Sequence, residues 1–318
     1  MSENPITLTK LLSVGNVVSA SIRIYRDNFK SYFGVAIRAT LWFLLPFLVL
    51  IPVPLILAYG QANISNSIFL LLITVWLLLF IYCTAKSIVN SAIIGRLVFG
   101  ILANQPETVR EVRRSLAPKI WSFLWAFFLF YLIVILVPFI LLFLMSFIGG
   151  IIITILGLSV NNNDLGSVIL GSTFLAILFI VLAILLARFF ILEIPLAVEE
   201  VAGATKTLGR SWELTKGYVR RIFIILVIAG LITLPVGIIL QIFTTMLQGI
   251  LLLAISPTQP IDATNPNIQF LSFLLGYAIG LLGNVFLLPF WQAIKAVVYY
   301  DLRTRREGID LQLRKQDI

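Results

Sequence analysis

The sequence predicts an all-α polytopic integral membrane protein with six transmembrane helices and amphipathic interfacial helices. The first observation is composition: of the 318 residues 60% are hydrophobic and 12% charged, and the mean hydropathy is +1.06. A water-soluble globule, which is about half apolar and about a quarter charged, is therefore excluded. The second and third observations are a series of long apolar blocks and an uneven distribution of basic residues between them.

Each of six apolar blocks suits one bilayer crossing, which takes about 20 apolar residues. The blocks lie near residues 39–59, 68–89, 121–147, 168–192, 222–253 and 268–294. As one helix, residues 121–160 would measure about 60 Å, twice the hydrocarbon thickness. Gly149 and Gly150 therefore predict a break, followed by an interfacial or membrane-outer segment.

The basic residues predict the orientation of the chain. None of the 23 Lys and Arg residues falls in the connections 60–67, 148–167 and 254–267. Because the basic residues of short loops stay in the cytoplasm, both termini are predicted to be cytoplasmic. The net charge of +9 indicates contact with anionic lipid on that side. No nucleic-acid-binding motif accompanies the charge, so nucleic acid is not an expected partner.

Three amphipathic stretches precede the odd-numbered crossings. Apolar residues at helical spacing among Lys and Arg are typical of helices that lie in the headgroup layer. The predicted apolar faces are Val18, Ile22, Tyr25 and Phe29; Val109, Val112, Leu116 and Ile120; and Leu208, Trp212, Thr215 and Val219.

The same spacing recurs between these stretches and a proline in the crossing that follows each of them. Phe29, Trp121 and Tyr218 lie at equal separations from Pro46, Pro138 and Pro235, respectively. This register predicts a threefold helical-hairpin repeat within a single membrane domain. The predicted units are residues 13–101, 105–198 and 202–300, followed by a cytoplasmic tail, 301–318.

Three basic residues occupy equivalent positions at the cytoplasmic ends of crossings 2, 4 and 6. They are Arg96, Arg188 and Lys295. If the repeat closes, these side chains converge on one ring, where they could bind phosphate headgroups or another anion. The alternative is that each extends to the interface and helps to fix the topology.

Ionisable and polar residues inside the apolar blocks form a second group of candidates. Lys86 and Asn90 lie one helical turn apart, and intramembrane ionisable groups are often functional. Lys86 could equally extend to the cytoplasmic surface. Glu193 lies five residues after Arg188, so it either forms a buried ion pair with Arg188 or marks the end of the helix.

The outer half of crossing 5 has one polar face, formed by Gln241, Thr244, Thr245 and Gln248. This face either lines a cavity or forms hydrogen bonds with a neighbouring helix. In crossing 6, Gly276 and Gly280 form a GxxxG motif, with Asn284 just beyond it. Close approach of two helices explains that motif.

The residue types that are missing exclude several kinds of chemistry. The chain has no histidine and a single cysteine, Cys83. Disulfide frameworks, zinc sites built on His or Cys, and imidazole-dependent catalysis are therefore excluded. We expect no enzymatic activity, no cofactor and no metal site.

Three stretches of the chain form a set of motifs: Tyr25-Arg26-Asp27-Asn28-Phe29, Ser211-Trp212-Glu213-Leu214-Thr215-Lys216-Gly217, and Tyr300-Asp301-Leu302-Arg303 with Glu307-Gly308-Ile309-Asp310-Leu311. Together they resemble the bacterial glycerophosphoryl diester phosphodiesterase membrane-domain family, a group of six-helix integral membrane proteins. The resemblance implies a stand-alone membrane domain in a bacterial inner membrane. It does not imply phosphodiesterase activity, because the metal-dependent catalytic domain needs histidines. In the tail, Arg303, Arg305 and Arg306 either attract anionic lipid or leave the main role to the carboxylates. We favour the second alternative, in which Asp301, Glu307 and Asp310 pair with basic groups of the interfacial helices.

Two functions fit these observations. In the first, the protein organises membrane lipid or a membrane protein complex, without catalysis, through the Lys and Arg residues of its cytoplasmic ends, here called the basic collar. Its partners would be anionic lipid headgroups or a membrane protein. In the alternative, the protein is a transporter or channel for an anionic or lipid-related solute. The path would then pass the ring of basic residues and the polar face of crossing 5.

Overall fold

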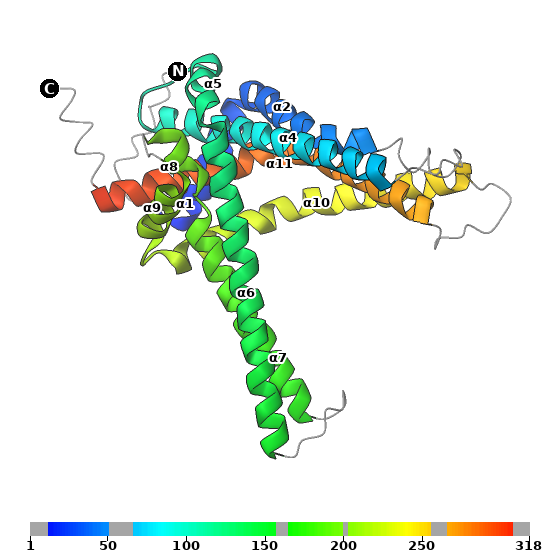
Figure 1. Ribbon diagram of the computed structural model, residues 1–318. Coiled ribbons are helices and arrows are strands. Elements are labelled where there is room, and N and C mark those ends of the chain that lie inside the picture. The colour runs from blue at the N-terminus through cyan, green and yellow to red at the C-terminus, as the bar shows by residue number, and fades with distance from the viewer. Residues whose placement is uncertain (1–11, 51–65, 157–164, 200–202, 256–265, 308–318) are drawn as a thin grey trace.

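The computed structural model describes residues 12–50, 66–156, 165–199, 203–255 and 266–307. Within these ranges the regular secondary structure is entirely helical (Figure 1). Six helices are long and apolar enough to cross a membrane, which confirms the predicted all-α polytopic fold. Residues 60–65, 157–164 and 256–265 of the predicted outer connections, and the tail from residue 308 with Asp310, lie outside the described residues.

The helices follow one another as a short helix and two long ones, three times over, with one additional short helix. The first group is α1 (Val14–Asp27), α2 (Phe29–Leu50) and α4 (Asn66–Leu102). The second is α5 (Val109–Leu116), the 3-10 turn η1 (Ala117–Lys119), α6 (Ile120–Leu156) and α7 (Leu165–Phe189). The additional helix α8 (Glu193–Val198) comes before the third group, α9 (Ala204–Thr215), α10 (Val219–Ile255) and α11 (Pro266–Glu307). The predicted repeat units stay a prediction.

Side-chain caps explain where two of the short helices begin. Ser13 precedes α1, and its hydroxyl accepts a hydrogen bond from the backbone N–H of Asn16 at 3.2 Å. Thr108 and Glu111 form a capping box at the start of α5, with each side chain bonded to the other residue's backbone N–H. Such caps satisfy backbone donors that the first turn leaves free.

The short helices pack one face against the ends of the long helices, and in two of them this buried face coincides only partly with the predicted apolar face. In α1 the buried residues include Val17, Ser21 and Ile24, whereas Ile22 is 40% exposed. In α9 the buried face includes Ser211, whereas Trp212 is 43% exposed. Ser21 and Ser211 can be buried because their hydroxyls donate to backbone carbonyls. A pattern based on hydrophobicity alone does not anticipate this.

The predicted break at Gly149 and Gly150 is wrong, because α6 continues through both glycines to Leu156. In a hydrocarbon environment no water competes for backbone hydrogen bonds, so a pair of glycines does not have to end a helix. Gly149 instead accommodates α7, since a Cβ atom there would lie 3.1 Å from the ring of Phe174.

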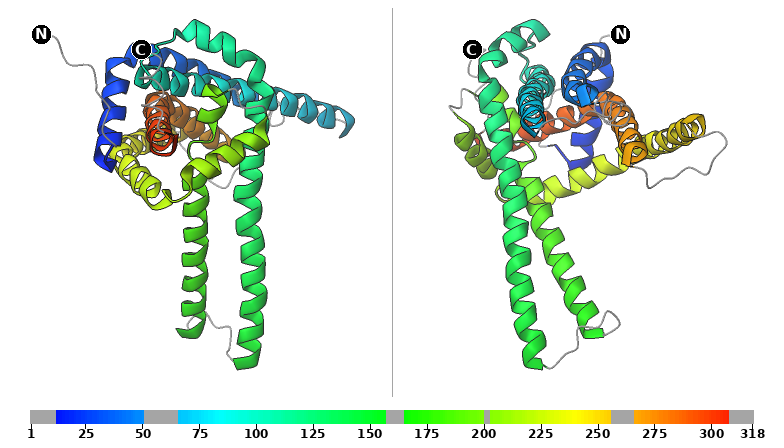
Figure 2. Two further views of the ribbon diagram at one scale, coloured as in Figure 1. Left: turned by 90° about the vertical axis from the view of Figure 1, so that its left-hand side faces the viewer. Right: turned by 45° about the vertical axis from the view of Figure 1, so that its right-hand side comes forward.

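The three hairpins share one core at the end of the molecule where the short helices lie. Helix α11 packs against α2, α4 and α10, whereas α6 and α7 diverge from the other long helices toward their tips (Figures 1 and 2). The hairpins are therefore not arranged evenly around one axis. The largest fully buried side chains of the shared core include Tyr32, Phe123, Ile194, Leu214 and Tyr299.

Candidate functional site

Carboxylates neutralise two of the three basic residues that were predicted to form a ring. Arg96 donates from Nε and Nη2 to the Glu107 carboxylate at 2.7 and 2.6 Å, a bidentate ion pair. Its Nη1 donates to the carbonyl of Ala197 at 3.0 Å, so Arg96 ties α4 to α8. A guanidinium with these partners has little capacity left for a headgroup phosphate.

Lys295, the second of these residues, forms an ion pair with Glu193. Glu193 is the first residue of α8, is 2% exposed, and also accepts a hydrogen bond from Nε2 of Gln292 at 2.9 Å. The sequence suggested Arg188 as the partner of Glu193, or a helix end. The turn between α7 and α8 directs the carboxylate to α11 instead, where Lys295 and Gln292 lie one turn apart.

Arg188, the third residue, pairs with no carboxylate among the described residues. Its guanidinium lies 4.6 Å from the ring centre of Trp212, and Nη1 donates to the Trp212 carbonyl at 3.1 Å. The Nε atom is buried and has no partner within the described part of the chain. Arg188 thus keeps a net positive charge. Whether any of the three residues binds a headgroup stays a prediction.

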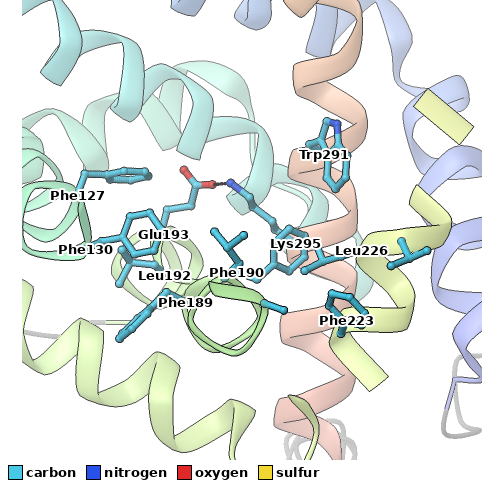
Figure 3. A pocket seen from close by; sticks show the side chains of 13 residues that line it. Phe127, Phe130, Phe189, Phe190, Leu192, Glu193, Phe223, Leu226, Trp291 and Lys295 are labelled. Atoms are coloured by element: carbon cyan, nitrogen blue, oxygen red, sulfur yellow. Dashed lines mark hydrogen bonds and ion pairs between the residues drawn. The ribbon is translucent and has the colours of Figure 1, made fainter. Parts of the chain in front are cut away.

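Two cavities lie on either side of the Glu193–Lys295 pair, and both are lined by Phe127, Glu193 and Lys295. The first has a volume of about 370 Å³ and lies between α6, α7, α10 and α11. Figure 3 shows aromatic side chains around the ion pair, among them Phe130, Phe190 and Trp291. The first cavity is therefore mainly apolar, with one neutralised pair of charges in its wall.

The second cavity is larger, about 590 Å³, and contains more polar groups. Small hydroxyl residues and two amides line it beside several phenylalanines; the polar ones are Thr40, Thr84, Ser87, Ser91, Asn284 and Gln292. Among the described residues, Oγ1 of Thr40, Oγ1 of Thr84 and Oε1 of Gln292 are buried and have no hydrogen-bond partner. Because Nε2 of Gln292 bonds to a carboxylate, the unpaired atom of this amide is fixed as an acceptor.

The sequence candidates Glu193, Lys295 and Asn284 meet at this second cavity, whereas Thr40, Thr84 and Gln292 were not among the candidates. Crossing 2 has a polar face that is detectable in the sequence, like the polar face of crossing 5, because Thr84, Ser87 and Ser91 share one face of α4. Gln292 has no comparable signal, because its importance depends on contact with α8.

The other predicted polar residues lie elsewhere. Nδ2 of Asn90 donates to the Lys86 carbonyl of its own helix at 2.7 Å. Gln248 donates to the carbonyl of Ser272 on α11 at 2.8 Å, and a Cβ atom at Gly276 would lie 3.0 Å from Nε2 of Gln248. The α10 face thus forms a helix–helix contact at Gln248. Thr245 bonds to the Gln241 carbonyl of the same helix and is exposed.

The end of the molecule where the short helices lie, here called the basic end, contains a second group of ion pairs. These ion pairs hold the end of α11 in place. Glu307 pairs with Arg210 of α9, as expected for the tail, and also with Arg303. Arg210 pairs in addition with Glu199. Burial lowers the pKa of Arg210, but the adjacent Glu307 and Glu199 carboxylates raise it more, so its net pKa lies above the ordinary value. Asp301 pairs with Arg221 of α10 and with Arg305.

Comparison with known proteins gives a family match for more than half of the chain. A family model described as a domain of unknown function, DUF7847, matches residues 107–302. The matched part includes Glu193, Gln292 and Lys295 but not α2 or α4. No curated protein and no solved structure matches the chain.

Proposed function

The chain belongs to the DUF7847 family, and we propose that it is a non-enzymatic integral membrane protein that binds a lipid-like amphiphile between its hairpins. The polar group of this ligand bonds to the hydroxyls and amides of the second cavity. Its apolar part lies along the phenylalanines. Because Glu193 and Lys295 neutralise each other, the cavity favours a polar group without net charge at this point.

The observation that carries this proposal is the group of unpaired polar atoms in the second cavity. A buried polar group without a partner costs about 1–3 kcal/mol, and Thr40, Thr84 and Gln292 each contribute one such atom. A volume of about 590 Å³ falls within the range of about 300–1,000 Å³ that is usual for ligand pockets. Long apolar helices surround the cavity, which supports a ligand that arrives from the bilayer.

The basic collar gives this lipid-binding protein its orientation in our proposal. We place the short helices on the cytoplasmic side of a bacterial inner membrane, since the described Lys and Arg residues lie on these helices or on the adjoining parts of the long ones. There the collar organises anionic lipid or contacts a membrane protein partner. The resemblance to the glycerophosphoryl diester phosphodiesterase membrane domain stays a prediction.

Native mass spectrometry of the chain extracted with its surrounding lipid tests the proposed ligand. Ser87→Leu places a larger apolar side chain in the cavity wall, and Thr74→Leu makes the same kind of change on the exposed face of the same helix. We expect the wild type and Thr74→Leu to retain one lipid class that Ser87→Leu loses. Equal retention by all three proteins would contradict the proposal.

Transport of a lipid-related or anionic solute is the second candidate function. Its specific support is that the Glu193–Lys295 pair belongs to the walls of both cavities, so a change in this pair would join them. Flux of fluorescent phospholipids across sealed vesicles containing the full chain tests it. Flux that Glu193→Leu/Lys295→Met alters, a change that leaves neither charge unpaired, would favour transport, and the absence of flux would favour lipid binding alone.

A further inference from the structure

Two basic residues, Arg38 and Arg113, lie outside the two cavities around Glu193 and form no ion pair with a described carboxylate. Arg38 is exposed on α2, and its positive charge acts on Arg113 of α5. Nη2 of Arg113 is buried, with no hydrogen-bond partner in the described part of the chain. No ion pair joins either guanidinium to a described carboxylate. Two like charges placed this way repel each other, and a bound anion would remove that repulsion.

A third cation, Lys86 of α4, lies at the same level of the first hairpin as Arg38. The rings of Trp42 on α2 and Tyr82 on α4 make an edge contact with 5.9 Å between their centres. Because the two helices run antiparallel, Arg38 and Lys86 each lie one turn from this contact toward the basic end. The Lys86 ammonium lies 5.5 Å from the Tyr82 ring centre and forms no ion pair with a described carboxylate.

An apolar surface continues from these cations along the outside of α2. A cavity of about 250 Å³ is lined by Arg38, Leu41, Trp42 and Leu45. Leu41 is 53% exposed and Leu45 is 38% exposed. Cations, an aromatic pair and an apolar strip thus follow one another from the basic end toward the hydrocarbon region. A phospholipid has the same order, from phosphate through the interface to the acyl chain.

We propose that Arg38, Lys86 and Arg113 bind the phosphate of one anionic phospholipid. Its acyl chain lies along α2 over Leu41, Trp42 and Leu45. Three cations without carboxylate partners favour a headgroup with net negative charge over a zwitterionic one. The site contains no residue of the two cavities around Glu193, so its failure would leave the proposed cavity ligand unaffected.

The test uses the full chain in nanodiscs of phosphatidylcholine with added phosphatidylglycerol, and native mass spectrometry counts the retained lipids. Arg38→Gln/Arg113→Gln should lower the apparent affinity for phosphatidylglycerol at least about tenfold, since it removes charge-assisted hydrogen bonds from two sides of the phosphate. The matched control, Arg110→Gln/Arg114→Gln, removes the same charge from exposed positions of α5. It should retain the lipid like the wild type.

Two further measurements separate a bound phospholipid from free phosphate and from a general effect of charge. If the double Gln variant does not fold, Lys86→Gln is the second test and should lower the affinity about threefold, the weaker effect expected of a point charge. Excess inorganic phosphate should leave the retained lipid in place; displacement would assign the site to free phosphate and overturn the proposal. Equal losses in the Arg110/Arg114 control would also overturn it, because they would reflect overall charge alone.

Discussion

The buried carboxylate of Glu193 on α8 and the partly buried ammonium of Lys295 on α11 form an ion pair in the wall shared by two cavities (Figure 3). Nε2 of Gln292 donates to the same Glu193 oxygen, Oε1. The contact fixes the turn after α7 against the third hairpin, and it removes the net charge from a site that is otherwise aromatic. The pair therefore links the packing of the fold to the cavities proposed for the ligand.

Breaking this pair should destabilise the protein strongly. Lys295→Met leaves the Glu193 carboxylate buried without a counter-ion, which costs about 3–5 kcal/mol in comparable cases. Glu193→Leu/Lys295→Met should cost clearly less than the sum of the two single changes. Unfolding of the four proteins in detergent micelles measures this coupling. Additive effects would show that the two side chains do not interact.

Gly100, in the last turn of α4, should tolerate no side chain, because the backbone of the following turn lies against it. A Cβ atom there would lie 2.7 Å from the backbone oxygen of Gln105, so Gly100→Ala must displace backbone and should cost about 1–3 kcal/mol. At Gly34, in α2, a Cβ atom meets nothing within 4 Å. Gly34→Ala should therefore be neutral or stabilise the helix by up to about 1 kcal/mol. Thermal unfolding of both variants tests the contact, and a stable Gly100→Ala would contradict it.

Arg210 should hold the end of α11 against α9. Arg210→Gln removes the ion pairs with Glu199 and Glu307, so amide hydrogen exchange should increase in α9 and at the end of α11. Because Arg210 is partly exposed, the loss should be about 1–2 kcal/mol. Lys206→Gln, an exposed change on the same helix, is the control. Unchanged exchange in Arg210→Gln would mean that these ion pairs do not hold the helices together.

The orientation of the chain can be measured separately. Reporter fusions after residues 63, 163 and 263 should report an external position, and fusions after 105, 205 and 318 a cytoplasmic one, as the distribution of basic residues predicts. A cytoplasmic signal at 163 would contradict the predicted topology.

The sequence predicts the fold well because the physics of membrane crossing is local. Length and hydropathy identify six spanning helices without knowledge of their neighbours. The break at Gly149 and Gly150 was wrong because glycine ends helices in water more readily than in hydrocarbon. The buried faces of α1 and α9 include serines whose hydroxyls bond to backbone carbonyls, for Ser21 within its own helix and for Ser211 on α7, and hydropathy does not register these bonds.

The candidate site was only partly predictable, because its residues acquire their partners through tertiary packing. Glu193 was selected as an ionisable residue inside an apolar block and Lys295 as one of three basic residues at equivalent helix ends, but the sequence does not pair them. Gln292 matters only because α8 places a carboxylate beside it. Arg38 and Arg113 are ordinary basic residues in the sequence, and nothing in it indicates that Arg38 acts on Arg113 in the folded chain.

The most direct test of the proposed ligand is photo-crosslinking from the cavity, with mass-spectrometric identification of the attached molecule. A photoreactive amino acid replaces Phe127, which lines both cavities, and in a control protein Phe139, which is 66% exposed on the same helix. We predict that position 127 attaches one lipid class in high yield, while position 139 attaches the mixture of the surrounding bilayer. The same mixture at both positions, or no attachment at 127, would contradict a ligand-binding cavity between the hairpins.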